Sequence, residues 1–474
     1  MLTSRHIPLL QGLARVPSRL GVPVPKSDVR RSRSSVLLQA LYWLLLLWVA
    51  GPAQPAALDP PPNPPAHTAE LPTADAGPPL SLDEASGLSL VDQPILTGRE
   101  AVINADERQA VAAAQLPDPK LTSGLKELPI DTGEAFSVRR DNFTEFTVGL
   151  SQDFPRADKR RLRGERKRLE ADTERAALDN DRRALRRDAA LAWLDVYEAE
   201  QGLTLARQLT SEAALQVQSL EKDYGNGKAS QADWEAAKVD AGLVADKEHD
   251  WLHRSLRTRA ELARWIGDAA QRPLASDLSL PAVPGALPEL MTAVDHHPVI
   301  GGLDKQIESS ATDIELARQA YKPDFSVEGY FAYRPGFSDF VGIQFTVDLP
   351  FFTKNRQDPA LAAALHQSHA SADRKQDLLR ELHAQVSQDY LDWRHFRERV
   401  DQFDTTIIPN ATRRIEDARS AYAAGRGNFD AVLLARRGRL DIQLQRLALA
   451  VEAARAQVRL QYFAAPQDHL EGAP

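Results

Sequence analysis

Two stretches of the chain have the apolar spacing and the composition of very long helices. Between Arg156 and Tyr224, 69 residues contain no proline; Ala, Leu, Arg and Glu dominate, and leucines recur near heptad spacing. At 1.5 Å per residue such a helix spans roughly 100 Å, too long for a compact domain of this size. The pattern therefore predicts a helix far longer than those of ordinary globular proteins.

The second long stretch runs from about 358 to 423. Asp358 is expected as its N-cap, with Pro359 at the first helical position, and Pro409 is expected to kink it. Shorter helices are expected at about 95–115, 230–267, 298–320 and 428–464. Because the return helices are about half as long, each long helix is expected to pair with two shorter ones stacked end to end.

Period-two alternation of apolar and polar residues marks the strand-like segments. Ser326, Gln344 and Thr346 stand between apolar or aromatic neighbours and are expected on the polar face. Such alternation over about 10 residues is typical of a transmembrane barrel strand, although a soluble hairpin packed on helices gives the same pattern. If the strands lie in a membrane, the residues expected to face lipid are Phe146, Val148, Leu150, Phe325, Val327, Ile343 and Phe345.

The first part of the sequence indicates export. Arg30, Arg31 and Arg33 precede an apolar run from Val36 to Ala50, and small residues follow. This order predicts a secretory signal peptide at 1–57, with a signal anchor as the alternative. From 58 to 79 the chain is rich in proline, which predicts an extended linker.

The rest of the chain repeats one pattern. Gln93-Pro94-Ile95 matches His297-Pro298-Val299, and Tyr224 to Lys228 matches Tyr422 to Arg426. Further anchors occur in the same order, so a tandem duplication is expected. The expected divisions are a first repeat at 80–284 (strands about 119–128 and 143–154, helical hairpin 156–267), a second repeat at 285–467 (strands about 324–334 and 339–349, helical hairpin 358–464) and a tail at 468–474.

Composition removes several classes of function. The net charge is −8, which argues against a nucleic-acid partner, and the absence of cysteine excludes disulfides and thiol chemistry. No motif for nucleotide binding or nucleophilic catalysis is present, so neither a catalytic residue nor a cofactor is expected. His296-His297 is the only histidine pair; without a third ligand it does not predict a metal site.

Four strands per chain are too few to close a membrane barrel, and a membrane barrel tolerates no open edge. Three chains would supply 12 strands. The residues themselves predict a mainly α fold with a small β part, in which several chains must share one barrel if the strands lie in a membrane.

From about Leu80 to Phe463 the duplicated plan resembles the TolC family of outer-membrane efflux proteins. The resemblance is carried by the prolines at the strand entries, by the Asp-apolar-Pro strand exits and by the Tyr-x-x-Gly turns; these are Pro119, Pro323, Asp153-Phe154-Pro155, Asp348-Leu349-Pro350, Tyr224-Gly225-Asn226-Gly227 and Tyr422-Ala423-Ala424-Gly425. The segment from Asp153 to Arg160 is similar to the branch that serves cobalt–zinc–cadmium efflux.

The resemblance implies a homotrimeric exit duct in the bacterial outer membrane with a long periplasmic extension. Its expected fold is a long α-helical coiled-coil barrel joined to a trimeric 12-strand transmembrane β-barrel, with four strands from each chain. Its partners would be a periplasmic adaptor (membrane fusion protein), an inner-membrane RND pump and outer-membrane lipid, and heavy-metal cations are a candidate substrate. The alternative is a periplasmic coiled-coil adaptor of an efflux or secretion system without a barrel. An adaptor, however, has one long hairpin rather than two repeated ones.

The turns between the helices gain a role from the resemblance. Locally, Gly227 and Gly425 permit the left-handed backbone that ends a helix, and Ser230 and Asn428 can cap the next one. The resemblance places these tips at the periplasmic mouth, against the adaptor, together with Lys228 and Arg426. Asp233 and Asp430 would be acidic residues at the entrance, although the second is shifted by one position relative to its turn.

A basic run begins just past the strand that ends at Pro155. Its members are Lys159, Arg160, Arg161, Arg163, Arg166, Lys167 and Arg168. Cations are unfavourable at a helix N-terminus, so a collar that faces lipid headgroups or the tunnel is one hypothesis. A solvated helix start is the other.

Overall fold

The computed structural model describes residues 77–131, 133, 135–278 and 285–464. The expected signal peptide, most of the proline-rich linker and the expected tail lie outside these residues. The elements are α2 Leu82–Leu88, α3 Pro94–Ala113, β1 Lys120–Lys126, β2 Glu145–Phe154, α4 Ala157–Gly225, α5 Gln231–Ile266, η1 Gly267–Gln271, α6 Leu287–Asp295, α7 Pro298–Gln319, β3 Phe325–Tyr333, β4 Phe340–Val347, η2 Thr353–Asn355, α8 Gln357–Gln402, η3 Phe403–Ile407, α9 Ile408–Ala423 and α10 Phe429–Phe463.

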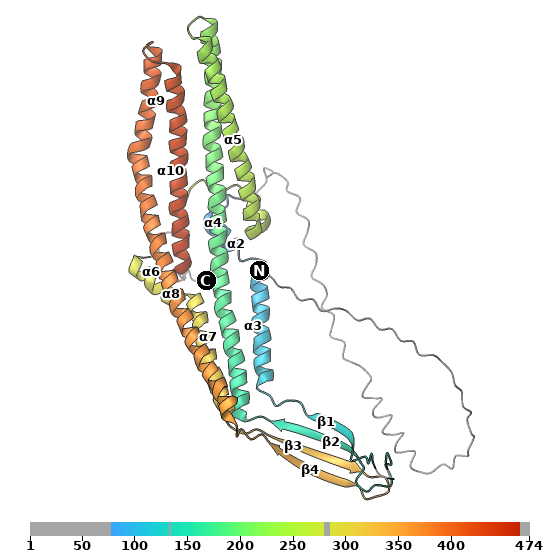
Figure 1. The fold of residues 1–474 in the computed structure, drawn as a ribbon. Helices are drawn as coiled ribbons and strands as arrows, with labels where there is room; N and C mark the ends of the chain where they lie inside the picture. The colour runs from blue at the N-terminus through green and yellow to red at the C-terminus, as the bar shows by residue number, and fades with distance from the viewer. Residues whose placement is uncertain (1–76, 132, 134, 279–284, 465–474) are drawn as a thin grey trace, which may run out of the picture. The chain divides into compact units, whose positions relative to one another are not determined.

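The helices pair as the sequence predicted. The long α4 packs against α3 along one part of its length and against α5 along another, and α8 packs against α7 and α10 (Figure 1). Helices α4 and α10 also pack together, which joins the two hairpins. None of the described helices combines the length and the apolar composition of a membrane-crossing helix.

The second long helix is interrupted just before Pro409. A π-helical turn, η3, separates α8 from α9, and Pro409 stands in the first turn of α9. Proline has no N–H, and its ring crowds the carbonyl four residues earlier, so the wider turn accommodates it. The expected interruption is therefore present, as a π turn.

The N-cap expected at Asp358 is wrong. The N-cap is Arg356, two residues earlier, and it makes no side-chain capping bond. Helix α8 begins at Gln357, so Pro359 is its third residue and not its first. The Asp358 carboxylate instead accepts a hydrogen bond from the Tyr321 hydroxyl at 2.7 Å. Because the short η2 already leads the chain into α8, no polar cap is needed to start the helix.

The four strands form one antiparallel sheet in the order β1-β2-β3-β4. The central pair joins the two halves of the chain, with Phe146 opposite Tyr333 and Phe154 opposite Phe325. Each outer strand has one neighbour in the sheet, so β1 and β4 each leave one edge open. The sheet lies at the end of α4 where β2 runs into that helix (Figure 1).

The main core lies where α2, α4, α5 and α10 meet. Trp193 is fully buried and donates its indole N–H to the Leu80 carbonyl at 3.1 Å. Farther along α4, a Cβ on Gly202 would lie 2.5 Å from the Trp251 ring of α5. Glycine is therefore required there for the two helices of the first hairpin to approach.

Candidate functional site

Glycine ends the outgoing helix of both hairpins. Gly227 has φ +71° and Gly425 has φ +66°, and no neighbouring atom would touch a Cβ at either position. The left-handed backbone alone therefore selects glycine. Lys228 and Arg426, which follow, are exposed.

Both return helices begin with the predicted side-chain caps. The Ser230 hydroxyl accepts from the Asp233 N–H at 3.1 Å, and the Asp233 carboxylate accepts from the Ser230 N–H at 3.4 Å. In the second hairpin the Asn428 side-chain oxygen accepts from the Ala431 N–H at 3.2 Å. Asp233 thus completes a capping box, a structural role that the sequence reasoning missed, whereas Asp430 is exposed in the first turn of α10.

The two tips share one small core. Its fully buried members come from both hairpins: Leu220, Ala237, Phe429, Val432 and Leu433. Beside it, the Tyr224 and Trp234 rings stack with centroids 5.6 Å apart. Burial raises the pKa of Tyr422, and the carboxylate of Asp233 raises it further. The tips therefore form a packed unit and are not independent loops.

Ion pairs hold the hairpins together below the tips. Arg437 of α10 pairs with buried Asp240 of α5, and Lys247 pairs with Asp441 at 2.9 Å. Closer to the main core, Arg455 contacts the buried Glu198 carboxylate of α4 at 2.9 Å. A buried carboxylate requires such a partner, but the sequence does not indicate which arginine of α10 supplies it.

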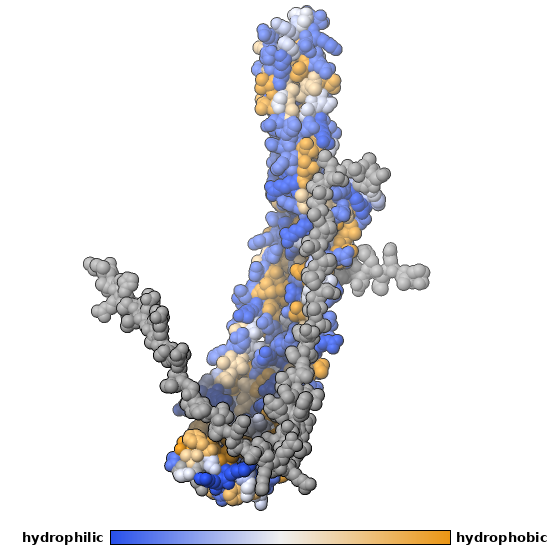
Figure 2. Space-filling view, turned by 90° about the vertical axis from the view of Figure 1, so that its right-hand side faces the viewer, coloured by the Kyte–Doolittle hydropathy of each residue, from blue (hydrophilic) through white to orange (hydrophobic). Residues whose placement is uncertain are grey.

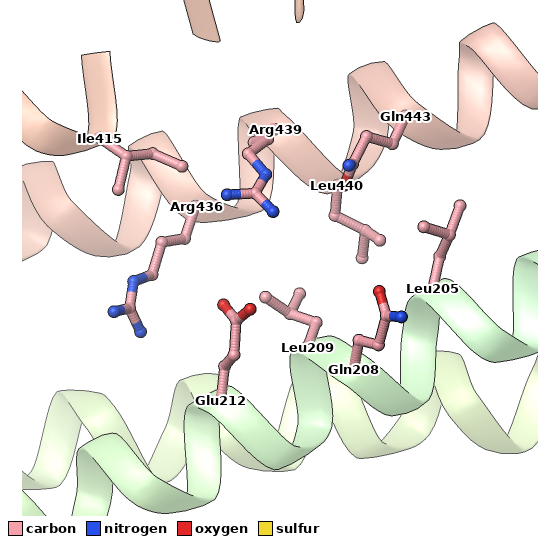
Figure 3. Close-up of a pocket in the computed structure, with 9 residues that line it drawn as sticks. All are labelled: Leu205, Gln208, Leu209, Glu212, Ile415, Arg436, Arg439, Leu440 and Gln443. Carbon is pink, nitrogen blue, oxygen red and sulfur yellow. The ribbon is translucent and has the colours of Figure 1, made fainter. Parts of the chain in front are cut away.

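A shallow pocket lies between α4 on one side and α9 and α10 on the other (Figure 3). From α10, Arg436 and Arg439 extend toward the α4 side of the pocket, where Glu212 lies. Burial lowers the pKa of Arg436, and its side chain donates to Gln216. The nine lining residues include no histidine, cysteine or hydroxyl group, and Glu212 is the one carboxylate among them.

The sheet separates apolar from polar side chains. The pairing register places all seven residues expected to face lipid on one face; these are Phe146, Val148, Leu150, Phe325, Val327, Ile343 and Phe345. Ile343 and Phe345 are 70% and 72% exposed, so nothing in the described chain covers them. The opposite face carries Ser326, Gln344 and Thr346, as the alternation predicted.

Exposed aromatic residues extend the apolar face beyond the strand ends. Phe351 and Phe352, just past β4, are 74% and 89% exposed, and Phe136 and Phe143 are exposed in the loop between β1 and β2. Figure 2 shows apolar surface at the sheet end of the molecule, while the surface along the helices is mostly hydrophilic with separate apolar patches. Aromatic residues at both margins of an apolar band are typical of membrane barrels.

Acidic partners neutralise much of the basic run at the start of α4. Lys159 pairs with Asp324 at 2.6 Å, Arg161 with Glu165, and Lys167 with Glu170. Asp324 also accepts from the N–H of Arg156, the residue before α4, at 3.0 Å. The Asp324 carboxylate, from the second half of the chain, therefore compensates the positive charge at the N-terminus of α4. Arg163 and Arg168 of the basic run are exposed.

Both ring nitrogens of His297 have a structural role. The ring accepts from the Val299 N–H at 3.4 Å through Nδ1, and Nε2 lies 3.2 Å from the Tyr462 carbonyl, to which it donates. Burial, followed by the nearby Arg183 charge, lowers the pKa of His297 to about 4. Within the described residues no group of three histidine or acidic side chains is arranged to hold a metal ion.

Comparison with solved structures defines the fold. The chain is similar to a membrane protein from Pseudomonas aeruginosa (TM-score 0.69, 16% identity, 84% of this chain and 99% of that chain). It is also similar to CusC, described in connection with transmembrane channel formation (0.69, 14%, 85% and 99%), and to the CmeC outer membrane channel of Campylobacter jejuni (0.67, 13%, 81% and 85%).

By sequence, no protein-family profile and no curated protein matches the chain. The structural likeness, at identities of 13–16%, establishes a mainly helical fold with a small antiparallel sheet, shared with outer-membrane channels. This agrees with the mainly α fold with a small β part that was expected from the sequence; the shared barrel and the trimer stay predictions.

Proposed function

We propose that the chain is the exit duct of a tripartite efflux system, a trimer whose shared 12-strand barrel lies in the bacterial outer membrane. The observation that carries the proposal is the four-stranded sheet, which has one exposed apolar face and two open edges. In a bilayer every strand edge must be paired, and pairing β4 of one copy with β1 of the next satisfies this condition. The likeness to outer-membrane channels supports it.

In this arrangement the apolar face meets lipid and the polar face lines a passive duct. The long hairpins extend into the periplasm toward an adaptor and an RND pump. Heavy-metal cations are the proposed substrate class, from the similarity of the segment that begins at Asp153. A periplasmic adaptor without a barrel is not favoured, because it leaves the apolar sheet face without a function.

The face assignment is testable because the chain contains no cysteine. Single variants Gln344→Cys and Ile343→Cys would be treated with a membrane-impermeant thiol reagent in proteoliposomes. We expect rapid labelling of Gln344→Cys and protection of Ile343→Cys until detergent is added. The reverse order would show that the faces are assigned backwards.

Assembly provides a second test. The protein is expected to be a trimer in detergent, and Ile343→Lys is expected to cost about 2–4 kcal/mol if the residue lies near the bilayer midplane. Size-exclusion chromatography with light scattering measures the oligomer. A monodisperse monomer that retains its strand signal would contradict the shared barrel.

The tips are proposed to contact the adaptor through Gly227, Lys228, Ser230, Gly425, Arg426 and Asn428, with Asp233 and Asp430 at the entrance. Replacing both Gly227 and Gly425 by valine is expected to abolish efflux while the trimer persists, because the sheet lies roughly 100 Å away. The matched control is Gly242→Val with Gly438→Val. These helical glycines have ordinary backbone angles and free space for a side chain.

Resistance in cells would be measured alongside outer-membrane protein levels. If the tip variant exports normally at normal levels, Gly227 and Gly425 only terminate helices, and the docking role is wrong.

A further inference from the structure

One carboxylate stands in the middle of the polar face of the sheet. Glu328 lies in β3, and its direct cross-strand neighbours are Ser151 of β2 and Gln344 of β4. Both neighbours are neutral. The nearest other charged residues on this face, Lys120 and Asp153, lie around Ser151 and pair with each other.

The position of this carboxylate depends on a glycine in the neighbouring strand, β2. Its Oε1 accepts a hydrogen bond at 2.8 Å from the Thr122 hydroxyl of β1, which lies two strands away. Between them, a Cβ on Gly149 would lie 2.8 Å from both oxygen atoms. Glycine at this position is therefore what allows Thr122 and Glu328 to meet across β2.

No cation neutralises Glu328 within the described part of the chain, where no basic nitrogen lies within salt-bridge distance of it. The lysines on the same face have other contacts. Lys120 pairs with Asp153 at 2.7 Å, and the Lys126 ammonium lies 5.1 Å from the centre of the Tyr330 ring. Glu328 thus carries an uncompensated negative charge.

We infer that Glu328 makes the wall of the duct favour cationic over anionic substrates. The inference rests on the proposed function, in which the polar face lines the lumen and three copies place three carboxylates at one level. Rings of carboxylates favour cations in channels in general. Because salt at 0.1 M screens charges beyond about 10 Å, the effect is greatest for solutes that pass along the wall and at low ionic strength.

The test measures the local potential beside Glu328 with the cysteine variant Gln344→Cys. Its rates of reaction with a cationic and an anionic methanethiosulfonate reagent would be compared in low salt, with and without Glu328→Gln. Directly opposite residues have Cβ atoms about 5 Å apart, so loss of one unit charge should lower the cation-to-anion rate ratio by roughly tenfold.

Two further variants make the result specific. Glu328→Asp keeps the charge and should keep most of the ratio. Glu145→Gln removes a carboxylate from the same face, but Glu145 lies six residues along β2 from Ser151, or roughly 20 Å, and should change the ratio by about twofold at most. Glutamine retains an acceptor for the Thr122 hydroxyl, so Glu328→Gln should still assemble.

The outcomes separate the two proposals. If Gln344→Cys does not react while Ile343→Cys does, the polar face does not line the lumen, and the proposed function fails. If Gln344→Cys reacts but its rate ratio is the same with Glu328→Gln, or falls equally with Glu328→Asp, the duct stands and the cation preference of Glu328 is overturned.

Discussion

The two helical hairpins have the same plan but differ in local chemistry. Helix α4 is continuous over 69 residues, while the corresponding path in the second hairpin is divided by a π turn. At the start of each half, Gln93 donates to the Trp265 carbonyl at 3.0 Å, and His297 donates to the Tyr462 carbonyl. Both carbonyls belong to the penultimate residue of a return helix. The comparison teaches that the architecture requires a donor there, and not a particular residue.

The largest difference is expected from moving the proline between hairpins. Alignment of the two tips places Ser211 of α4 opposite Pro409. Ser211→Pro should cost about 3 kcal/mol or more, because α4 has no π turn to accommodate it. Pro409→Ser should change the free energy of unfolding by less than about 1 kcal/mol. The π turn η3 already holds the carbonyl four residues before Pro409 away from the proline ring, so little strain is relieved. Thermal unfolding in detergent measures both, and equal losses would contradict this view of the π turn.

His297 should give the second half a pH dependence of stability that Gln93, at the matching position in the first half, cannot give. Below pH 6.5 the unfolded chain protonates His297, but the folded chain does not until about pH 4. Neutral His297 therefore lowers the free energy of unfolding only below pH 6.5. The loss grows as the pH falls and reaches roughly 3 kcal/mol at pH 4.

His297→Gln reproduces the chemistry of Gln93 and should remove this part of the pH dependence. The measurement is the difference in unfolding free energy between the native protein and the variant from pH 7 to pH 4. A constant difference would show that His297 titrates alike in both states.

The two long helices should also differ at their starts. Asp324→Ala leaves Lys159, which is 13% exposed, without a counterion and removes the acceptor for the Arg156 N–H. We expect a loss of about 2 kcal/mol. Asp358→Ala removes only an exposed contact with Tyr321 and should cost less. Chemical denaturation measures the free energy of unfolding of both variants. A larger loss for Asp358→Ala would show that Asp324 does not stabilise the start of α4.

Regular periodicity allowed much of this architecture to be predicted. The alternation of residues such as Ile343 and Gln344 specified both faces of the sheet, because side chains in a strand alternate with period two. Glycine and a polar residue at each turn likewise specified the tips, as at Gly425 and Asn428.

Contacts between distant segments could not be predicted. Asp324 and the helix start that it compensates are 168 residues apart, and Thr122 and Glu328 are 206 apart. The N-cap at Asp358 was wrong for a related reason, because Tyr321 and the preceding η2 turn compete with the local capping signal. Local propensity does not include such competitors.

The pairing of β2 with β3 has a consequence for how the chain folds. Partner residues in this pair are separated by 171 to 187 positions. The backbone groups of β2 that face β3 therefore have no hydrogen-bond partner until the second half of the chain is present. Loop closure over such a distance slows folding, and an unpaired edge that waits invites association with other chains. The first half therefore exposes an unpaired strand edge until the second half has been synthesised.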